Sequence, residues 1–232
     1  MAGMVEEHYR GEAGQRYQQQ KRAVPSAAVP WVTRLRAAKF QPFVKPADTV
    51  VEFGLGLGWN LAQLKCARRI GTDLENFLPA DLKGGIEFFT NSSDIASDTA
   101  DVLICHHVLE HVENPPAMLQ EAKRVLKPGG LLLLHVPFEK ERRYRNFDPS
   151  EPNFHLYSWN VQTLANLVDS QDLAIVECGL REFGYDRFAS KLALRLRLGE
   201  NAFRTIRRLV HLIIPGCEVR LLARKNAVRG KV

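Results

Sequence analysis

The sequence lacks the cysteine pattern of a disulfide-stabilised or zinc-binding protein. Its four cysteines form no Cys-x-x-Cys pair and are scattered along the chain at Cys66, Cys105, Cys178 and Cys217. We therefore expect neither a disulfide framework nor a cysteine zinc site, and we expect a reducing, cytoplasmic compartment. Histidines and acidic residues do not recur at metal-ligand spacing either, so we expect no bound metal.

Long apolar segments are also missing. Residues 1–7 lack the apolar core of a secretory signal, and no run approaches the ~18–20 apolar residues that span a bilayer. The chain has 232 residues, of which 45% are hydrophobic and 25% charged. This composition is typical of a globular protein that is large enough for one full hydrophobic core.

The positive charge is concentrated near the end of the chain. Residues 181–232 hold 13 Lys or Arg against 4 acidic residues, whereas residues 1–180 carry a net charge of −3. The segment 191–214 has an apolar stripe opposite several arginines, so it is expected to pack on the protein or form a homodimer contact. The alternatives are an anionic substrate, an anionic membrane surface or nucleic acid. Nucleic acid is the least favoured, because no basic groove with interleaved aromatic residues is visible.

Strand and helix signals alternate along most of the chain. Strands are expected at 49–53, 69–72, 86–90, 101–105, 131–136, 173–177 and 218–223, and helices at 31–40, 59–66, 114–126, 158–168 and over most of 185–214. This alternation predicts an α/β fold with a doubly wound, mostly parallel, seven-stranded sheet and a helical insertion at about 187–214, before the last strand.

The first 45 residues are set apart from this alternation. Residues 1–28 are polar, rich in Gln, Arg and Ala, and contain Tyr9 and Tyr17, and a helical pattern follows at 31–40. We consider two interpretations equally: a flexible leader followed by a packing helix, or a helical lid whose aromatic residues close over a ligand. The domain prediction takes residues 1–45 as this lid and residues 46–232 as the main domain.

A glycine-rich turn follows the first expected strand, in the sequence Glu52-Phe-Gly54-Leu-Gly56-Leu-Gly58. Glycine has no Cβ and lets the backbone approach a ligand closely. In doubly wound sheets ligands bind beyond the carboxyl ends of the strands, where this turn lies. Asp73, Asn91, the pair Cys105-His106 and the segment 135–139 also follow strands. These positions together predict one binding site.

Three motifs carry a family resemblance. The glycine turn resembles motif I of class I S-adenosylmethionine-dependent methyltransferases. The stretch Asp101-Val-Leu-Ile-Cys-His-His-Val-Leu-Glu-His111 resembles the strand 4 motif of their small-molecule subgroup, which includes the ubiquinone and menaquinone methyltransferases. The stretch Arg124-Val-Leu-Lys-Pro-Gly-Gly-Leu-Leu-Leu-Leu134 is similar to that subgroup's motif before strand 5. The resemblance covers residues 45–180 and implies a Rossmann-like methyltransferase fold that binds S-adenosylmethionine and releases S-adenosylhomocysteine.

The resemblance also implies which residues bind this cofactor. Glu52 would accept hydrogen bonds from the methionine ammonium group, and the three glycines would leave room for the ligand. Asp73 would accept hydrogen bonds from the ribose hydroxyls, although a carboxylate there also serves NAD enzymes. The adenine would meet Asn91 and Ser92, where the family often has an acid. The remaining cofactor contacts are assigned to Cys105 and His106, next to the methionine part.

Methyl transfer needs alignment of the two reactants and, for a hydroxyl acceptor, a base. His155 is the first candidate for this base and His107 the second, because both follow strands at the substrate end. His111 is interpreted as a packing residue and His135 as a buried neutral residue. The charged segment 138–157, with Arg142, Arg143 and Arg145, is expected to cover an anionic substrate.

We therefore expect a methyltransferase that acts on a small molecule or glycan, and oxygen is the atom that we favour as the methyl acceptor. The first alternative is a methyltransferase that acts on RNA or protein, which only the basic segment supports. The second is a non-catalytic module that keeps the cofactor as structure, and the intact glycines and Asp73 argue against it. No Cys-x₃-Cys-x₂-Cys run is present, so radical chemistry on this cofactor is not expected.

Overall fold

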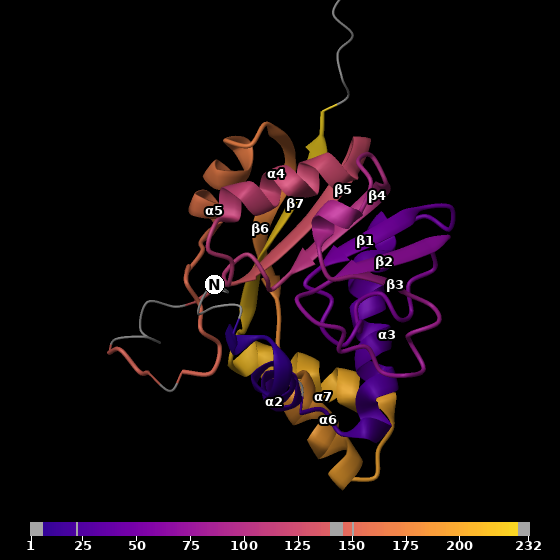
Figure 1. Ribbon diagram of the computed structural model, residues 1–232. Helices are drawn as coiled ribbons and strands as arrows, with labels where there is room; N and C mark the ends of the chain where they lie inside the picture. Colours follow the sequence, from indigo (N-terminus) through magenta and orange to yellow (C-terminus); the bar gives the residue numbers. More distant parts are fainter. Residues whose placement is uncertain (1–6, 22, 140–145, 150, 227–232) are drawn as a thin grey trace, which may run out of the picture.

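The computed structural model describes residues 7–21, 23–139, 146–149 and 151–226. Its centre is a seven-stranded sheet in the order β3-β2-β1-β4-β5-β7-β6 (Figure 1). All pairs from β3 to β5 are parallel, and β7 is antiparallel to both of its neighbours. The strands are β1 (Thr49–Phe53), β2 (Arg68–Thr72), β3 (Glu87–Phe89), β4 (Ala100–His106), β5 (Leu126–Pro137), β6 (Leu173–Glu182) and β7 (Cys217–Lys225). The predicted doubly wound sheet is confirmed.

Both faces of the sheet are covered, which explains why its central strands are apolar throughout. On β5, Leu132 and Leu134 pack in the core beneath α4 (Pro115–Val125) and α5 (Val161–Asp169). Leu131 and Leu133 point to the opposite face, where α3 (Val29–Phe40) contributes Phe40 to a second core. Side chains of a strand alternate between the two faces, so one apolar run supplies both cores.

Helix α5 starts later than the sequence suggested. Asn160, and not Ser158, is its N-cap: the Asn160 side chain accepts a hydrogen bond from the Thr163 N–H, and the Thr163 hydroxyl accepts one from the Asn160 N–H. This reciprocal capping box satisfies two N–H groups that the first turn would otherwise leave without partners. The prediction of Ser158 as the cap is therefore wrong by two residues.

The expected helix at 59–66 does not form. Residues 59–63 are turns, and irregular chain leads from them into β2. An α-helix would place main-chain N–H groups on the carbonyl groups of Leu61 and Leu64. Here the guanidinium of Arg69 donates to both carbonyl oxygens, with 3.1 Å between its Nε and the Leu61 oxygen. The Leu61 oxygen also accepts from the Leu64 N–H in a tight turn, whereas the Lys65 N–H, which a helix would place there, donates to the Gln41 side chain at 2.8 Å. The glycine turn is consequently followed by a compact loop and not by a helix N-terminus.

Four helices form a cap beyond the carboxyl ends of the central strands (Figure 1). They are α2 (Gly11–Lys21), α3, α6 (Asp186–Arg195) and α7 (Glu200–Ile213). Val32 of α3, Trp59, Ala193 of α6 and Phe203 of α7 form a third apolar cluster that joins these parts. The expected helical insertion before the last strand is thus present, and it packs on the N-terminal helices.

Short 3-10 helices complete the described elements. They are η1 (Ser26–Ala28), η2 (Gln41–Phe43) and η3 (Ser92–Asp94). Within the described ranges, no helix has both the length and the apolar character needed to cross a membrane.

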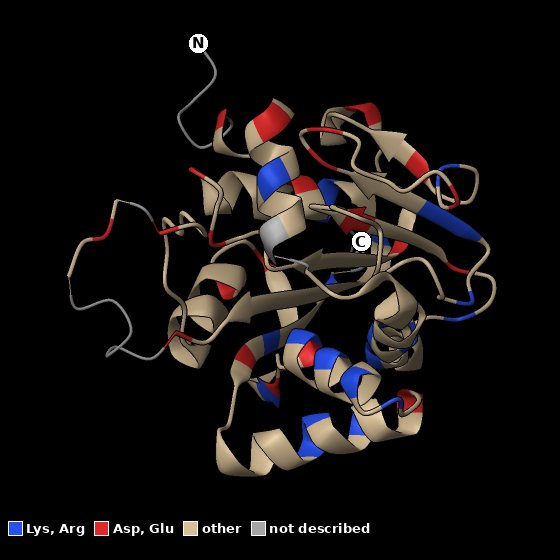
Figure 2. Ribbon diagram, turned by 90° about the horizontal axis from the view of Figure 1, so that it is seen from below, with Lys and Arg blue, Asp and Glu red and all other residues tan. Residues whose placement is uncertain are grey.

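The outer face of α7 combines basic and apolar residues. Leu212 is 80% exposed and Ile213 is 81% exposed, close in sequence to the exposed Arg208. Figure 2 shows how the Lys and Arg residues are distributed over the cap helices. Contact of this segment with a membrane surface or a second copy of the chain stays a prediction.

Candidate active site

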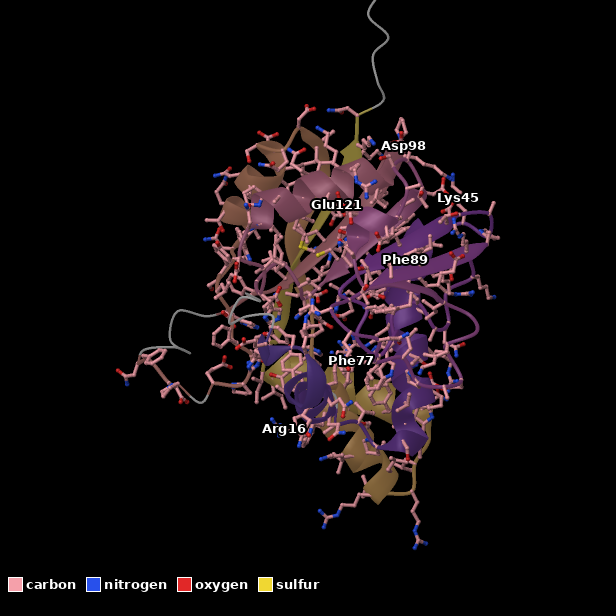
Figure 3. The ribbon with its side chains drawn as sticks, in the orientation of Figure 1. Arg16, Lys45, Phe77, Phe89, Asp98 and Glu121 are labelled. Carbon is pink, nitrogen blue, oxygen red and sulfur yellow. The ribbon has the colours of Figure 1, made fainter. Side chains whose placement is uncertain are left out.

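A cavity of about 710 Å³ lies between the sheet and the cap. It opens where the carboxyl ends of β1 and β4 lie side by side, with Phe53 next to Cys105. The strand order reverses at this position, and such a switch point is where doubly wound sheets bind their ligands. Phe77 and Glu121, both labelled in Figure 3, are part of its lining.

The glycine turn forms one wall of the cavity. Gly54, Gly56 and Gly58 all have positive φ angles, of 72°, 52° and 70°, which glycine adopts without the cost that a side chain would bring. Gly54 and Gly56 line the cavity, whereas Gly58 does not and packs against Leu78. A Cβ on Gly54 would overlap the Val108 side chain. The turn therefore provides bare backbone on its ligand side, as the predicted cofactor requires.

Asp73 follows β2 and points at this turn. Its two carboxylate oxygens accept hydrogen bonds from the Gly56 N–H at 2.7 Å and the Leu74 N–H at 2.8 Å. Asp73 lines the cavity together with Asn91 and Ser92. The Asn91 side-chain oxygen caps η3 by accepting from the Ser93 N–H. Asp73 after β2 and the pair Asn91-Ser92 after β3 thus lie at one end of the cavity. Their carboxylate, amide and hydroxyl groups fit the hydrogen-bonding groups of a nucleoside.

Glu52 lies behind the cavity wall and not in it. The residue is 1% exposed, and its carboxylate accepts a hydrogen bond from the Asn60 side chain at 2.5 Å. Asn60 in turn accepts from Arg36, which lies on α3 and lines the cavity. Glu52 therefore acts on the cavity wall through Asn60, and Arg36 extends this chain of contacts to the cap. Its direct hydrogen bond to a methionine ammonium group stays a prediction.

The structure separates the two residues predicted at the end of β4. Cys105 is buried in the core under α4 and α5, is absent from the cavity lining, and has a thiol whose pKa burial raises. The assignment of Cys105 to the cofactor is thus not supported for its side chain. His106 lines the cavity on the other face of the strand. Alternation of side chains along β4 accounts for this difference.

His107 also lines the cavity and has a strained backbone. Its φ is +58°, which is uncommon for a residue with a side chain. Its N–H donates to the His135 carbonyl oxygen at 2.9 Å, and its ring lies 4.3 Å from that of Phe183. Such strain recurs at functional sites, where the surrounding structure holds it in place. Of the two predicted bases, His107 is the one that lines the cavity.

A buried charged cluster supports these histidines. Glu218 of β7 is fully buried, and its carboxylate contacts Lys39 Nζ at 2.5 Å, His135 Nδ1 at 2.7 Å and His107 Nε2 at 3.2 Å. Lys39 Nζ also lies 2.8 Å from His106 Nε2. We call Lys39, His106, His107, His135 and Glu218 the Glu218 cluster. It ties α3, β4, β5 and β7 together at the edge of the cavity.

Burial and mutual charge set the protonation of the Glu218 cluster. Burial lowers the pKa of Lys39 to about 8 and that of His135 to about 4. Burial and the nearby Lys39 ammonium also lower the pKa of His106. Burial alone would raise the pKa of Glu218, but Lys39 and the histidines hold it well below its usual range. At neutral pH the cluster therefore holds one carboxylate, one ammonium and neutral His135 and His106 rings.

We expect this arrangement to make stability sensitive to acid. The pKa of His135 is about 4 when folded and 6.5 without perturbation, so the unfolded chain binds more protons between these values. Stability from His135 is then complete above pH 6.5 and falls as the pH drops toward 4. Between pH 6.5 and 5 the wild type should lose about 1.5 kcal/mol more than His135→Gln in urea unfolding. Parallel pH profiles would contradict this assignment.

The first candidate base, His155, lies outside the cavity lining. Its Nδ1 is 2.7 Å from Glu139 Oε1, and its ring lies 4.8 Å from that of His111. His111 does line the cavity and contacts the Tyr9 hydroxyl through Nδ1 at 2.8 Å. Tyr9 and Tyr17 also belong to the lining, so the described N-terminal residues cover the cavity. Arg142, Arg143 and Arg145 lie outside the described residues, so their contact with an anionic substrate stays a prediction.

Sequence reasoning missed several residues of the site. Lys39 and Glu218 were not singled out, nor were the cap residues of the lining. The sequence contained one indication of Glu218, because it is the single acidic residue of the predicted last strand. It contained no indication of Lys39, since a lysine near the end of a surface helix is common. The missed residues that line the cavity include Arg36, Phe183, Tyr185, Asp186 and Arg187.

Comparisons with known proteins agree with this geometry. A family model described as "Methyltransferase domain" matches residues 19–178. Among curated proteins, the rat thiol S-methyltransferase TMT1B is 45% identical over 47 residues, which is 20% of this chain and 19% of the relative. The mouse protein of the same name is 43% identical over 47 residues. The chain thus aligns with about a fifth of the length of these relatives.

Solved structures share the fold at low sequence identity. A methyltransferase from Thermotoga maritima has a TM-score of 0.61 at 16% identity, covering 96% of this chain and 100% of that one. Phosphoethanolamine N-methyltransferase 2 of Haemonchus contortus, in complex with S-adenosylmethionine, has a TM-score of 0.60 at 12% identity, covering 97% and 60%. A Haloferax volcanii methyltransferase, in complex with the Trm112 activator, has a TM-score of 0.61 at 15% identity, covering 97% and 99%.

Proposed function

Because the chain belongs to the methyltransferase-domain family, we propose that it transfers the methyl group of S-adenosylmethionine to a hydroxyl oxygen of a small molecule or glycan. The family match confirms the predicted family and, with it, S-adenosylmethionine as the cofactor. The acceptor and the methylated atom are the proposed part.

The observation that carries this proposal is a cavity with two chemically different ends. One end holds the glycine turn, Asp73 and Asn91, and fits the cofactor. The other end holds His107, Phe183 and Tyr185 beneath the cap. The volume of about 710 Å³ lies within the roughly 300–1,000 Å³ of clefts that bury drug-sized ligands. A cavity of this total size, part of which the cofactor would fill, favours a small acceptor or one sugar unit over a folded macromolecule.

We assign Asp73 to the ribose of the cofactor. A charged hydrogen bond of this kind contributes ~1.5–3 kcal/mol, so Asp73→Ala should weaken S-adenosylmethionine binding by about one to two powers of ten. Calorimetric titration measures this change, and Asp81→Ala, at an exposed acid outside the cavity lining, serves as the matched control. Unchanged affinity in Asp73→Ala would remove Asp73 from the ribose.

The proposed reaction needs alignment and one proton acceptor. When bound, the cofactor supplies an electrophilic methyl group. His107 Nε2 donates to the Glu218 carboxylate, which only accepts, so Nδ1 is the basic nitrogen of the neutral ring. Nδ1 takes the proton of the acceptor hydroxyl while the new C–O bond forms and the C–S bond breaks. The products are the methylated acceptor and S-adenosylhomocysteine, and the proton remains on His107.

A thiol acceptor is the second candidate. Its support is the match of 45% identity over 47 residues to a thiol S-methyltransferase. The same base and the same cavity would serve a thiol, which ionises more readily than a hydroxyl. Thiols therefore belong in any acceptor screen beside sugars and phenols.

The test has two stages. Calorimetry with S-adenosylmethionine, S-adenosylhomocysteine and NAD should show micromolar binding of the two sulfur ligands alone. A screen of sugars, phenols and thiols, read out as released S-adenosylhomocysteine, should then identify the acceptor class. Binding of NAD in place of the sulfur ligands would overturn the proposal. Turnover of RNA or protein, with none of the small acceptors, would overturn its substrate class.

A further inference from the structure

A second polar cluster lies beside the cavity, on the far side of His107 from Glu218. Glu110 and His111 follow β4, and His155 comes from the segment that leads into α5. One side-chain ligand atom from each residue lies within 4.8 Å of the other two. Glu110 is fully buried, and its Oε1 is 3.6 Å from His111 Nε2. Two imidazoles and a carboxylate thus converge in a buried position that the sequence spacing did not suggest.

Hydrogen bonds to the outer nitrogens orient both imidazoles. The carboxylate of Glu139 only accepts, so His155 donates to it from Nδ1 at 2.7 Å. The Tyr9 hydroxyl donates its single proton to the Asn153 carbonyl oxygen at 2.5 Å, and it must therefore accept from His111 Nδ1 at 2.8 Å. In the neutral rings, both Nε2 atoms then carry the lone pair.

These contacts match the surroundings of histidine ligands in metalloproteins. A metal-bound histidine usually donates its other ring N–H to a carboxylate or another oxygen, which fixes the tautomer and the ring orientation. Here Glu139 and Tyr9 take that place for His155 and His111. Among the described residues, Nε2 of His155 has no hydrogen-bond partner. His155 also brings one ring nitrogen within 4.8 Å of a ligand atom of Glu110 and of His111.

The Glu218 cluster provides an internal comparison. His106, His135 and Glu218 also bring three ligand atoms within 4.8 Å of one another. There, however, Lys39 Nζ lies 2.5 Å from Glu218 and 2.8 Å from His106. The Lys39 ammonium group already neutralises the Glu218 carboxylate, and its positive charge would repel a metal ion at this position. Around Glu110, the Oε1 atom lies 3.8 Å from His107 Nδ1 and 3.6 Å from His111 Nε2.

We propose that Glu110, His111 and His155 bind a divalent transition metal ion of the zinc class. Two histidines and one glutamate are an established ligand set for zinc with one open position, and the same donors suit cobalt. Metal bonds of about 2.0–2.2 Å place ligand atoms roughly 3.3 Å apart. The present spacings, from 3.6 Å up to 4.8 Å, require contractions of about 0.3 Å to about 1.5 Å, which side-chain rotations of the two imidazoles can supply. This proposal replaces the expectation that the chain binds no metal.

The metal would have a defined part in the proposed reaction. His111 and Tyr9 line the cavity, so the open position of the ion faces the acceptor end. An acceptor oxygen or sulfur bound there would be held in place and made more acidic, close to His107. This role rests on the proposed methyl transfer, whereas the metal site itself does not.

The test is a metal titration in the absence of cofactor and acceptor. Full-length protein treated with a chelator and then titrated with Co²⁺ should bind one equivalent, with visible absorption bands and a calorimetric signal. His155→Gln should weaken binding at least about 100-fold, and Glu139→Gln about 10–100-fold through loss of orientation. His135→Gln, the matched change in the Glu218 cluster, should retain one equivalent with unchanged affinity.

The outcomes separate the hypotheses. Failure of the wild type to bind Co²⁺ or Zn²⁺, or unchanged binding by His155→Gln, would overturn the metal site. If His135→Gln loses the metal while His155→Gln retains it, the ion lies in the Glu218 cluster, and this outcome also overturns the proposed site. Circular dichroism of each variant identifies any that fail to fold, and Glu139→Gln keeps the test valid if His155→Gln is one of them. S-adenosylmethionine titrated into the same preparations tests the methyltransferase proposal independently.

Discussion

Replacement of His107 by Gln should lower kcat about 10²–10⁴-fold for a hydroxyl acceptor, the range that a positioned base contributes. His107 Nε2 is held by Glu218 at 3.2 Å, and the strained backbone at φ +58° aims the ring into the cavity. Glutamine retains a donor for Glu218 but has no basic nitrogen. The affinity for S-adenosylmethionine should remain within a few-fold, because the cofactor residues lie at the other end. Single-turnover assays with the identified acceptor measure the change.

His211→Gln is the matched control for this variant. His211 is a buried histidine of α7 and does not line the cavity. Its replacement should leave kcat within a few-fold of the wild type. If His107→Gln turns over at the wild-type rate while the control does the same, no base acts from this position. Equal losses in both variants would mean that the cap, and not the proton transfer, had been disturbed.

Lys39→Met should destabilise the protein by about 3–5 kcal/mol, the cost of breaking a buried ion pair by removing one partner. Glu218 has no exposed surface, and Lys39 approaches its carboxylate to 2.5 Å. Without the ammonium, the carboxylate must remain charged next to neutral imidazoles, or one imidazole must take up a proton at neutral pH. Urea unfolding at pH 7.5 measures the loss.

Two comparisons sharpen this prediction. Glu87→Gln removes a pair that is nearly half exposed, Arg68–Glu87 at 2.6 Å, and should cost no more than about 1 kcal/mol. The double variant Lys39→Met/Glu218→Gln should be more stable than the sum of the two single changes indicates, since it leaves neither charge buried alone. A loss below 1 kcal/mol in Lys39→Met would show that the buried pair contributes no more than a surface pair.

The fold could be predicted because its signals are local. The central strands β1, β4 and β5 are marked by apolar runs, and α4 by Asn114, two prolines and a following Pro-Gly-Gly. Alternation of such segments leaves few possible topologies. The helix expected at 59–66 failed for a reason that is not local. Gln41 accepts the Lys65 N–H that a helix would direct to Leu61, and Arg69, on the next strand, donates to the carbonyl groups of Leu61 and Leu64.

The site was predictable where the topology alone places residues. The carboxyl ends of parallel strands meet at one edge, so Asp73, Asn91 and His106 reach one cavity. Sequence position could not show that Cys105 points into the core or that Glu52 lies behind Asn60. It could not reveal contacts between distant segments either, such as Lys39 with Glu218, or Glu110 with His155. The metal ligands escaped notice because they converge only after the chain has folded.

The place of β7 in the sheet has a consequence for synthesis on the ribosome. This strand is translated after β5 and β6, yet it lies between them in the sheet and carries the carboxylate of the Glu218 cluster. Until residues 217–225 leave the exit tunnel, no strand connects β5 to β6. Lys39 also lacks the Glu218 carboxylate that it contacts in the folded protein. A nascent chain in which β7 has not yet emerged therefore exposes two strand edges and an incomplete cavity, and such edges favour aggregation. Termination before β7 should yield chains that are cleared and not merely inactive.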